Sequence, residues 1–324
     1  MLSLLANGEA FNYLMFAGSV FTLLITFLGI ILFRGKLPCD QGRAFAVNGE
    51  KSKGKPRGAG IIFIITFALT SLIFVPFASE YLIYIGLVVI AMLTGFFDDA
   101  SDKPWGELKK GLLDLVISIV LAVTYIYYNG HEIYLPFIQG RIIIPIPLLF
   151  ILIIILAWAS INVTNCTDGV DGLCGSLSII TMISIYFLAK ELANDSFFGN
   201  MIMFMIFSII PYLWFNASPS QLLMGDAGSR AIGFFIAIAA LKSQNPVMYI
   251  FVAFVMIIDG GLGLVKLTVM RVFKVKFMAN IRMPIHDHMR KNLKWSDTQT
   301  VIRFVIIQII ISALVILLCS SMLK

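Results

Sequence analysis

Residues 80–110 read EYLIYIGLVVIAMLTGFFDDASDKPWGELKK, an apolar run that ends in two adjacent aspartates. A run of this length fits a helix that crosses the hydrocarbon core of a membrane. An aspartate costs about 2.5 to 3.5 kcal/mol at the centre of a bilayer and less toward its surface, so Asp98 and Asp99 are expected near the surface. Neighbouring carboxylates repel unless a cation or proton relieves them. The pair is a candidate for binding a metal or moving a proton, and a solvated helix end is the alternative.

The rest of the chain has the composition of an integral membrane protein. Of its 324 residues, 59% are hydrophobic and 13% are charged, and the mean hydropathy is +0.94. These values lie far outside the range of soluble domains. Apolar runs of about 20 residues recur, whereas the strands of a membrane barrel would give alternating segments of about ten. We expect an all-α, polytopic membrane bundle in a single domain over residues 1–324.

Ten apolar segments are predicted to be membrane-spanning helices. The first is too long for a signal-peptide core and lacks a small-residue cleavage site, so it is expected to be retained. The eighth is the shortest and carries Arg230. The predicted spans are 11–33, 58–76, 80–97, 111–129, 142–163, 171–189, 198–216, 229–242, 246–270 and 299–322.

Lysine and arginine are divided unequally between the two sets of loops. Loops 34–57, 98–110, 164–170, 217–228 and 271–298 hold 7, 3, 0, 0 and 7 of them, whereas the opposite set holds four. The positive-inside rule therefore places the first set in the cytoplasm and both termini outside. This asymmetry also explains the formal charge of +6 without nucleic acid, because no basic stretch is interleaved with stacking aromatics. In the outer set, residues 131–147 predict a small β-hairpin around Gln139-Gly140.

A polar motif, NVTNCTDGVDGL, lies between the fifth and sixth predicted spans at residues 162–173. Asx residues and glycine suit turns and helix caps, so Asp171 could simply cap the next helix. Asparagine and aspartate also offer the donors and acceptors that bind a heterocyclic base or a sugar. We therefore take Asn162, Asn165, Asp168 and Asp171 as candidate substrate-binding residues.

A second motif lies between the seventh and eighth predicted spans, where Asn216 is followed by MGDAGSR at residues 224–230. Asp226 opens the predicted helix and could be an N-cap. A helix N-terminus beside a carboxylate also suits a metal–phosphate complex. With Asp98, Asp99 and Asp168 expected on the same side, several carboxylates could converge on one Mg²⁺, which needs only one or two carboxylates besides phosphate and water.

The last loop of the basic set contains RMPIHDHMRK at residues 282–291, with two of the three histidines of the chain. His286 and His288 flank an aspartate in a basic stretch. This pattern suits contacts to a diphosphate better than a zinc site, because no third soft ligand matches. Arg282 and other basic side chains could balance a substrate with several negative charges. The other basic residues are Lys103, Lys109 and Lys110.

These motifs, in this order, resemble the polyprenyl-phosphate N-acetylhexosamine-1-phosphate transferase superfamily. The resemblance rests on Asp98-Asp99 after an apolar span, NVTNCTDGVDGL, MGDAGSRAIG and PIHDHMRK, and it covers nearly the whole chain. Two features are most similar to its phospho-N-acetylmuramoyl-pentapeptide transferase branch. One is Pro284-Ile285 before the histidine segment, and the other is the tail with Trp295-Ser296 and VIRF at 301–304.

The resemblance implies transfer of phospho-MurNAc-pentapeptide from UDP-MurNAc-pentapeptide to undecaprenyl phosphate, giving lipid I and UMP in peptidoglycan synthesis. It implies Mg²⁺ as cofactor and an active site on the cytoplasmic face of the bacterial cytoplasmic membrane. A homodimer is left open. It also implies roles for individual residues. These are a metal ligand at Asp226, the aspartate that acts on the lipid phosphate at Asp98 with Asp99 beside it, and positions that line the nucleoside and metal pocket at Asn165, Asp168 and Asn216. Lys110 matches a lysine after the acidic pair, and His286 matches the first residue of the histidine run. The catalytic candidates are then Asp98, Asp99, Asp226 and His286, and the substrate-binding candidates are Lys110, Asn162, Asn165, Asp168, Asp171, Asn216, Arg282 and His288.

The chain departs from the pattern of the superfamily at three places. His286-Asp287-His288 replaces a triple histidine, and Leu223 stands where an aromatic often stacks on uracil. In the segment SKGKPRGAG, Ser52 stands at the position of a lysine, which leaves open whether Lys51 or Lys53 substitutes. Two alternatives remain. One is transfer from UDP-GlcNAc, and the other is an ion-coupled transporter, which predicts broken helices in corresponding halves.

Overall fold

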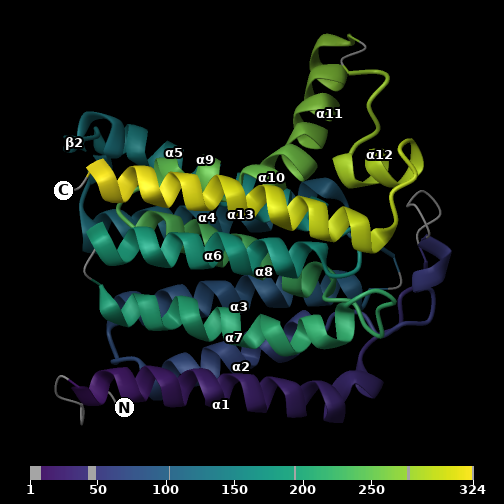
Figure 1. Ribbon diagram of the computed structural model, residues 1–324, viewed down its shortest axis with the longest axis horizontal. Helices are drawn as coiled ribbons and strands as arrows, with labels where there is room; N and C mark the ends of the chain where they lie inside the picture. Colours follow the sequence, from purple (N-terminus) through teal and green to yellow (C-terminus); the bar gives the residue numbers. More distant parts are fainter. Residues whose placement is uncertain (1–8, 43–48, 102, 193–194, 276–277, 323–324) are drawn as a thin grey trace.

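The structure is a computed structural model that describes residues 9–42, 49–101, 103–192, 195–275 and 278–322. Its helices lie side by side in one bundle (Figure 1), which confirms the all-α membrane fold. The long helices are α1 (Glu9–Phe33), α2 (Gly60–Phe74), α3 (Ser79–Asp99), α4 (Glu107–Asn129), α5 (Ile146–Thr167), α6 (Leu173–Leu192), α7 (Ser196–Asn216), α8 (Gly225–Lys242) and α13 (Asp297–Met322). Shorter elements are η2 (Arg34–Lys36), η3 (Gly49–Ser52), η4 (Pro136–Ile138), η5 (Pro246–Met248), α9 (Tyr249–Val252), α10 (Phe254–Met256), the π-helical turn η6 (Ile257–Gly261), α11 (Leu262–Phe273) and α12 (Ile285–Lys291).

Within the described residues, seven helices are long and apolar enough to cross a membrane, and one bent pair would make an eighth. Two of the predicted spans form helices that are not among the seven long, apolar ones. Segment 58–76 forms α2, which has only 15 residues, and segment 229–242 lies in α8, whose 18 residues are all buried. Because α8 is surrounded by α2, α3, α5 and α6, it does not need an apolar face toward lipid. All ten predicted segments are helical, and the number that crosses the bilayer stays a prediction.

The ninth predicted span, 246–270, is broken in the structure. Its two parts, Pro246–Val252 and Phe254–Phe273, meet at an angle of 71°, and α11 leaves the bundle (Figure 1). In the second part, α10 is followed directly by the π-helical turn η6, which contains Asp259. A π-turn inside an apolar helix often marks a functional site. A transporter would be expected to break helices in both halves, whereas this is the one bent pair found in the described part of the chain.

The predicted hairpin is confirmed. Strand β1 (Glu132–Leu135) pairs antiparallel with β2 (Gly140–Ile143), and Glu132 lies opposite Ile143. Gln139 adopts a left-handed backbone conformation with φ of 50°, which is uncommon for a residue other than glycine. The turn therefore forms where the Gln139-Gly140 pair predicted it.

Glycines let the first turn of α8 approach its neighbours at backbone contact. A Cβ on Gly60 of α2 would lie 2.1 Å from the nitrogen of Gly228, and a Cβ on Gly95 of α3 would lie 2.3 Å from the carbonyl carbon of Asp226. Small residues at helix crossings allow such close approach inside membranes. The start of α8 is consequently held between the start of α2 and the end of α3.

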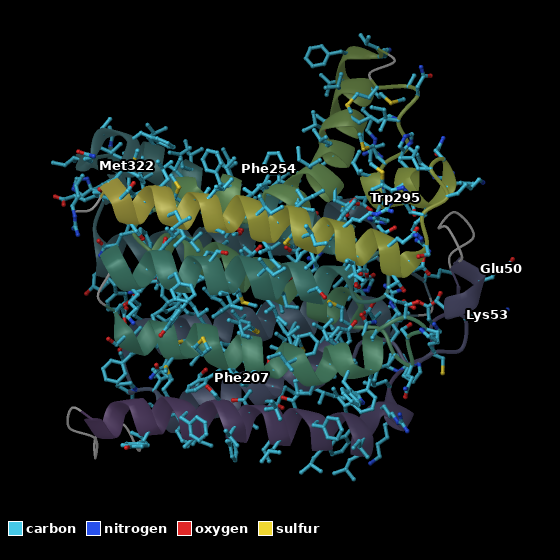
Figure 2. All side chains as sticks on the ribbon, in the orientation of Figure 1. Glu50, Lys53, Phe207, Phe254, Trp295 and Met322 are labelled. Carbon is cyan, nitrogen blue, oxygen red and sulfur yellow. The ribbon has the colours of Figure 1, made fainter. Side chains whose placement is uncertain are left out.

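The loops of the basic set gather at one end of the bundle. The start of α1 and the end of α13 lie at the opposite end (Figure 1). Figure 2 shows Glu50, Lys53 and Trp295 at the end away from Met322. The polar motifs therefore share one end, as the alternation of spans predicted, and the side of the membrane that this end faces stays a prediction.

Candidate active site

Acidic and basic side chains from a loop and three helices meet at this end of the bundle. We call them the carboxylate cluster. Its members are Asp40 and Arg57 from the loop before α2, Asp98 and Asp99 from the end of α3, Lys110 from α4 and Asp226 from the first turn of α8.

Arg57 contacts three of the carboxylates. Its Nε donates to Asp99 Oδ1 at 2.7 Å and its Nη1 donates to Asp40 Oδ2 at 2.8 Å. Its Nη2 donates to Asp226 Oδ1 at 3.3 Å. Burial opposes ionisation of the guanidinium, but these carboxylates raise the pKa of Arg57 above its ordinary value. Burial likewise opposes ionisation of Asp40, yet Arg57 and the N–H of Gly42 hold the pKa of Asp40 below its ordinary value.

Lys110 bridges the remaining members of the cluster. Its Nζ lies 2.5 Å from Asp98 Oδ2 and 3.1 Å from Asp226 Oδ2. One ammonium thus lies between a carboxylate of α3 and a carboxylate of α8. The interpretation of Asp226 as a plain N-cap does not describe this site, because both of its oxygens bind cations.

The two adjacent aspartates have different partners. Asp99 Oδ2 accepts the backbone N–H of Ala227 at 3.1 Å, so this carboxylate caps the first turn of α8 from another helix. Its side chain is 1% exposed. Asp98 Oδ1 accepts the backbone N–H of Trp105 at 2.6 Å, and its side chain is 8% exposed. Asp99 is therefore committed to holding α3 against α8, and Asp98 is the member of the pair that shares Lys110 with Asp226.

The chemistry of the cluster fits a divalent cation. Its four carboxylates and two cationic side chains leave a formal charge of −2. Mg²⁺ prefers oxygen ligands and needs only one or two carboxylates when phosphates and water complete its shell. Asp98 and Asp226 already share one small cation, the ammonium of Lys110. Within the described residues, no three His, Cys, Asp or Glu side chains are grouped to hold a metal by themselves, so phosphates would have to complete the shell.

The motif at 162–173 lies beside α8. Asn165 Nδ2 donates to Ser229 Oγ at 2.9 Å, which brings Asn165 within one turn of Asp226. Asp168 is the C-cap residue of α5 and is half-buried. Asn162 donates to the carbonyl of Trp158 at 2.8 Å within its own helix. Of these predicted residues, the structure brings Asn165 nearest to the start of α8.

Asp171 and Asn216 connect two loops. Asp171 Oδ2 accepts the N–H of Ser220 at 3.0 Å. Asn216 is buried, with its Oδ1 accepting the N–H of Gly172 at 2.8 Å and its Nδ2 donating to Leu222 O at 2.9 Å. Both groups of the Asn216 amide are thus used by the backbone. In this structure these two predicted substrate-binding residues shape the loops that border the cluster.

His286 is oriented by an aspartate inside the broken helix. Its backbone N–H donates to Asp259 Oδ1 at 2.7 Å, and its Nδ1 lies 2.8 Å from Asp259 Oδ2. A carboxylate only accepts, so the Nδ1 proton is assigned to this hydrogen bond. The other ring nitrogen, Nε2, faces Gly169, where a Cβ would lie 2.3 Å from it. His286 therefore lies against the loop that follows α5, next to Asp168.

The other predicted residues of the histidine segment have local partners. His288 Nδ1 accepts the backbone N–H of Arg282 at 3.2 Å. Arg282 Nε lies 4.0 Å from Asp287 Oδ2. Arg290 donates to Gly169 O at 3.3 Å and pairs with Asp297 at 2.7 Å. Arg290 thus joins α12 to the loop after α5 and to α13, a role that the sequence did not suggest.

Sequence reasoning missed three residues of the site. Arg57 and Asp40 lie in a basic loop whose charges were interpreted as a topology signal. Asp259 had a signal of its own, because an aspartate inside an apolar run is costly and marks a functional site by default. Of the two lysines considered near Ser52, Lys53 is exposed, and the side chain of Lys51 lies outside the described residues.

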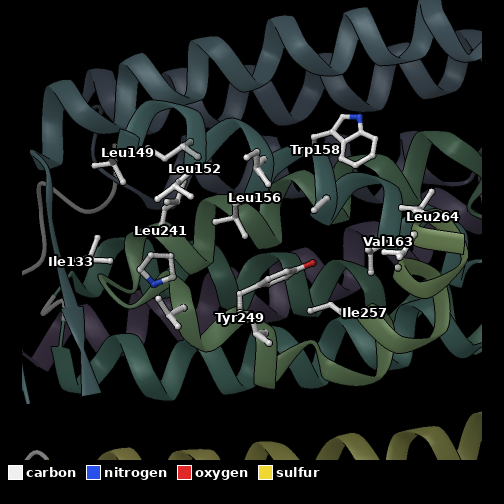
Figure 3. A pocket seen from close by; sticks show the side chains of 18 of the residues that line it. Ile133, Leu149, Leu152, Leu156, Trp158, Val163, Leu241, Tyr249, Ile257 and Leu264 are labelled. Atoms are coloured by element: carbon white, nitrogen blue, oxygen red, sulfur yellow. The ribbon is translucent and has the colours of Figure 1, made fainter. Parts of the chain in front are cut away.

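An apolar pocket of about 480 Å³ lies between α5, the end of α8 and the broken helix. Figure 3 shows Ile133 toward one end of its lining and Val163 and Leu264 toward the other, with Trp158 and Tyr249 between them. Val163 lies two residues before Asn165. The pocket thus runs from the hairpin toward the polar end of the bundle.

Comparison with known proteins identifies the family. The family model described as glycosyl transferase family 4 matches residues 81–244, which include Asp98, Asp99, Lys110 and Asp226. The chain belongs to glycosyl transferase family 4. This family 4 transferase is 36% identical over 290 residues to a phospho-N-acetylmuramoyl-pentapeptide-transferase of Treponema pallidum (strain Nichols), covering 84% of this chain and 80% of that relative.

Further relatives carry the same name. The protein of Dictyoglomus thermophilum is 30% identical over 280 residues, which are 83% of this chain and 86% of the relative. The protein of Helicobacter acinonychis is 25% identical over 338 residues, which are 94% of each chain. The similarity therefore extends beyond the residues matched by the family model and supports a multi-pass bacterial membrane transferase.

Proposed function

We propose that this family 4 transferase moves phospho-MurNAc-pentapeptide from UDP-MurNAc-pentapeptide to undecaprenyl phosphate, giving lipid I and UMP. The observation that carries this proposal is the meeting of Asp98, Lys110 and Asp226 at one end of the bundle, beside Asn165. The identity of the transferred sugar is inferred from the names of the relatives. We also propose that this end faces the cytoplasm at the bacterial cytoplasmic membrane, because the basic loops gather there.

The reaction exchanges one phosphorus–oxygen bond for another. An oxygen of the lipid phosphate attacks the β-phosphorus, and the bond from that phosphorus to the oxygen bridging the α-phosphorus breaks, so that this oxygen leaves on UMP. Such a transfer needs mainly positioning and neutralisation of charge. A phosphate monoester has its second pKa near 6 and is largely ionised at neutral pH. Asp98 therefore need not remove a proton and can orient the attacking phosphate through Lys110, whose ammonium it holds.

Asp226, with Asp98 as its neighbour across Lys110, would hold Mg²⁺. When bound, the metal would neutralise the diphosphate and the charge that develops on the leaving oxygen. Asn165 lies beside this position and offers an amide to the nucleotide. His286 presents Nε2 toward the loop that follows α5, held by Asp259.

The apolar pocket suits the lipid carrier. Its lining is apolar apart from a few groups such as the Tyr249 hydroxyl (Figure 3), and it ends near Val163, close to Asn165 in the chain. Burial of apolar surface from water is worth about 25 cal/mol for each Å². A polyprenyl tail that enters the pocket from the bilayer leaves lipid and not water, so its gain comes from packing against the lining. We assign the pocket to the part of the tail nearest the phosphate.

The test supplies purified protein with undecaprenyl phosphate and Mg²⁺ and adds UDP-MurNAc-pentapeptide or UDP-GlcNAc in parallel. UMP and the lipid product are followed. We expect turnover of the first nucleotide sugar, its loss on chelation with EDTA, and recovery with added Mg²⁺. Turnover of UDP-GlcNAc alone would overturn the assignment of the sugar, and full turnover in excess EDTA would overturn that of the metal.

A further inference from the structure

Arg57 is fixed at the centre of the carboxylate cluster by its own loop. The backbone N–H of Arg57 donates to Pro38 O at 2.8 Å. Asp40 forms two more backbone bonds across the loop, donating to Lys55 O at 2.9 Å and accepting from Gly54 N at 2.8 Å. These bonds pair residues 38–40 with residues 54–57. The backbone of Arg57 is consequently held in place by its pairing with Pro38.

Asp40 in turn fixes the guanidinium of Arg57. Asp40 Oδ1 accepts the N–H of Gly42 at 2.8 Å and the hydroxyl of Ser52 at 3.0 Å. Its Oδ2 is left for Arg57 Nη1. Asp40 is 4% exposed. Ser52 therefore supports Arg57 through Asp40.

The basic residues around Ser52 have different surroundings. Lys53 is exposed at the rim (Figure 2), and Lys55 donates to Ser220 Oγ at 2.9 Å. Among the described side chains of this segment, Arg57 is the one whose cation contacts the carboxylates of α3 and α8. Arg57 is therefore the residue of this segment that places a positive charge in the carboxylate cluster.

The guanidinium connects two like charges. Asp99 Oδ1 and Asp226 Oδ1 bind the same group, through Nε and Nη2. Without it, two carboxylates on neighbouring helices would face each other in a buried site, where like charges repel strongly. Arginine suits this place because its planar fork has five N–H donors in fixed directions, whereas lysine offers a point charge on a flexible stem.

We propose that Arg57, held by Asp40, is a positioning residue of the transferase reaction. It fixes Asp226 against Asp99 through Oδ1, so that Asp226 presents Oδ2 beside Lys110. Arg57 acts through Asp226 and does not contact the nucleotide. The inference rests on the proposed function, because it concerns the residues that would carry that reaction.

The test compares Arg57→Met, Arg57→Lys and Asp40→Asn with the wild-type protein. Turnover of UDP-MurNAc-pentapeptide gives kcat and KM, scanning fluorimetry gives Tm, and calorimetry gives the binding of UMP without turnover. We expect kcat to fall about 100-fold for Arg57→Met, the scale of a lost charged contact in an active site. It should fall about tenfold for Arg57→Lys, which keeps the positive charge, and for Asp40→Asn, which keeps the guanidinium fork. KM and the affinity for UMP should stay within about threefold, since the contacts that bind the substrate equally in the ground state and the transition state are unchanged. Lys36→Met, in the exposed turn η2 at the same end of the bundle, is the matched control and should change nothing.

Several outcomes would overturn the inference. A higher KM or weaker UMP binding with unchanged kcat would make Arg57 a substrate contact. A lower Tm with unchanged kcat would make it structural only. Full activity of Arg57→Lys would show that the fork is not needed. If Arg57→Met does not fold, Arg57→Lys and Asp40→Asn carry the test. Failure of the wild-type protein to use UDP-MurNAc-pentapeptide would instead count against the proposed function.

Discussion

The two ends of α8 each carry a partly buried group of charges, and the two groups differ in how their charges are placed relative to the helix dipoles. At its C-terminal end, Lys242 Nζ lies 3.1 Å from Glu80, 3.0 Å from Asp195 and 2.9 Å from Asn129 Oδ1. We call these four residues the lysine cluster. Lys242 is in the last turn of α8, Glu80 in the first turn of α3, and Asp195 is the N-cap of α7. Each charge lies where the dipole of its helix favours it.

The carboxylate cluster at the other end breaks this rule. Asp226 is favoured in the first turn of α8, but Asp98 and Asp99 are the last two residues of α3. The carbonyl end of a helix disfavours negative charge. Arg57 and Lys110, from other elements, offset this cost and still leave a formal charge of −2. Proteins tolerate such local conflicts at functional sites. The lysine cluster is therefore expected to serve stability and the carboxylate cluster to serve catalysis.

The largest effect is expected for Asp226→Asn. It removes the carboxylate that Arg57 and Lys110 share, and transferase activity should fall about 1000-fold, the upper scale for one charge-stabilising group. Tm should change little, because Arg57 and Lys110 keep Asp40, Asp98 and Asp99 as partners. UMP release and scanning fluorimetry measure the two quantities. Asp195→Asn, at the other end of the bundle, should lower Tm and keep activity within about twofold. A fully active Asp226→Asn protein would remove the distinction between the ends.

Lys242→Met should lower stability and leave activity nearly unchanged. Its loss leaves the half-buried carboxylates of Glu80 and Asp195 without their cation, which costs about 2 kcal/mol of stability. Tm should drop, while kcat of the protein that remains folded at low temperature should stay near the wild-type value. Loss of kcat at unchanged Tm would show that the lysine cluster takes part in the reaction.

Gly95→Ala tests whether the carboxylate cluster depends on backbone contact. Its Cβ would lie 2.3 Å from the carbonyl carbon of Asp226, so α3 must shift away from α8. A displacement of about 1 Å can cost up to about 100-fold in rate, and we expect a loss of about 30-fold in kcat with a lower Tm. Gly86→Ala is the matched control on the same helix, because nothing lies within 4 Å of its Cβ. Equal effects of the two variants would refute the close-contact argument.

The smallest effect is expected for Asp259→Asn. The amide can present N–H instead of oxygen to His286 Nδ1, which favours the other tautomer and alters what Nε2 offers to the loop at Gly169. A loss of about tenfold in activity is expected, comparable to that of other groups that orient a histidine. The chemical shifts of the labelled imidazole nitrogens report the tautomer. An unchanged tautomer and unchanged activity would limit Asp259 to a structural role.

Much of the fold followed from local properties of the chain. Each of the ten apolar segments is long enough to prefer a helix in a membrane, and the structure makes each of them helical. The hairpin followed from Gln139-Gly140. The break after Val252 was not predicted, since residues 246–270 form a largely apolar run whose only charged residues are Asp259 and Lys266. The gathering of the motifs at one end followed from the alternation of spans alone.

The sequence by itself determined which residue types meet at that end, because hydrophobic runs set where the chain turns and polar motifs occupy the turns. Only the tertiary structure determined which contacts each of these residues makes. Adjacent side chains on a helix point about 100° apart, so the rotation of α3 against α8 directs Asp99 to the N–H of Ala227 and Asp98 to Lys110. The same packing brings Arg57 between Asp99 and Asp226. A contact between residues so far apart in the chain depends on the close packing of α8 and leaves no local pattern in the sequence.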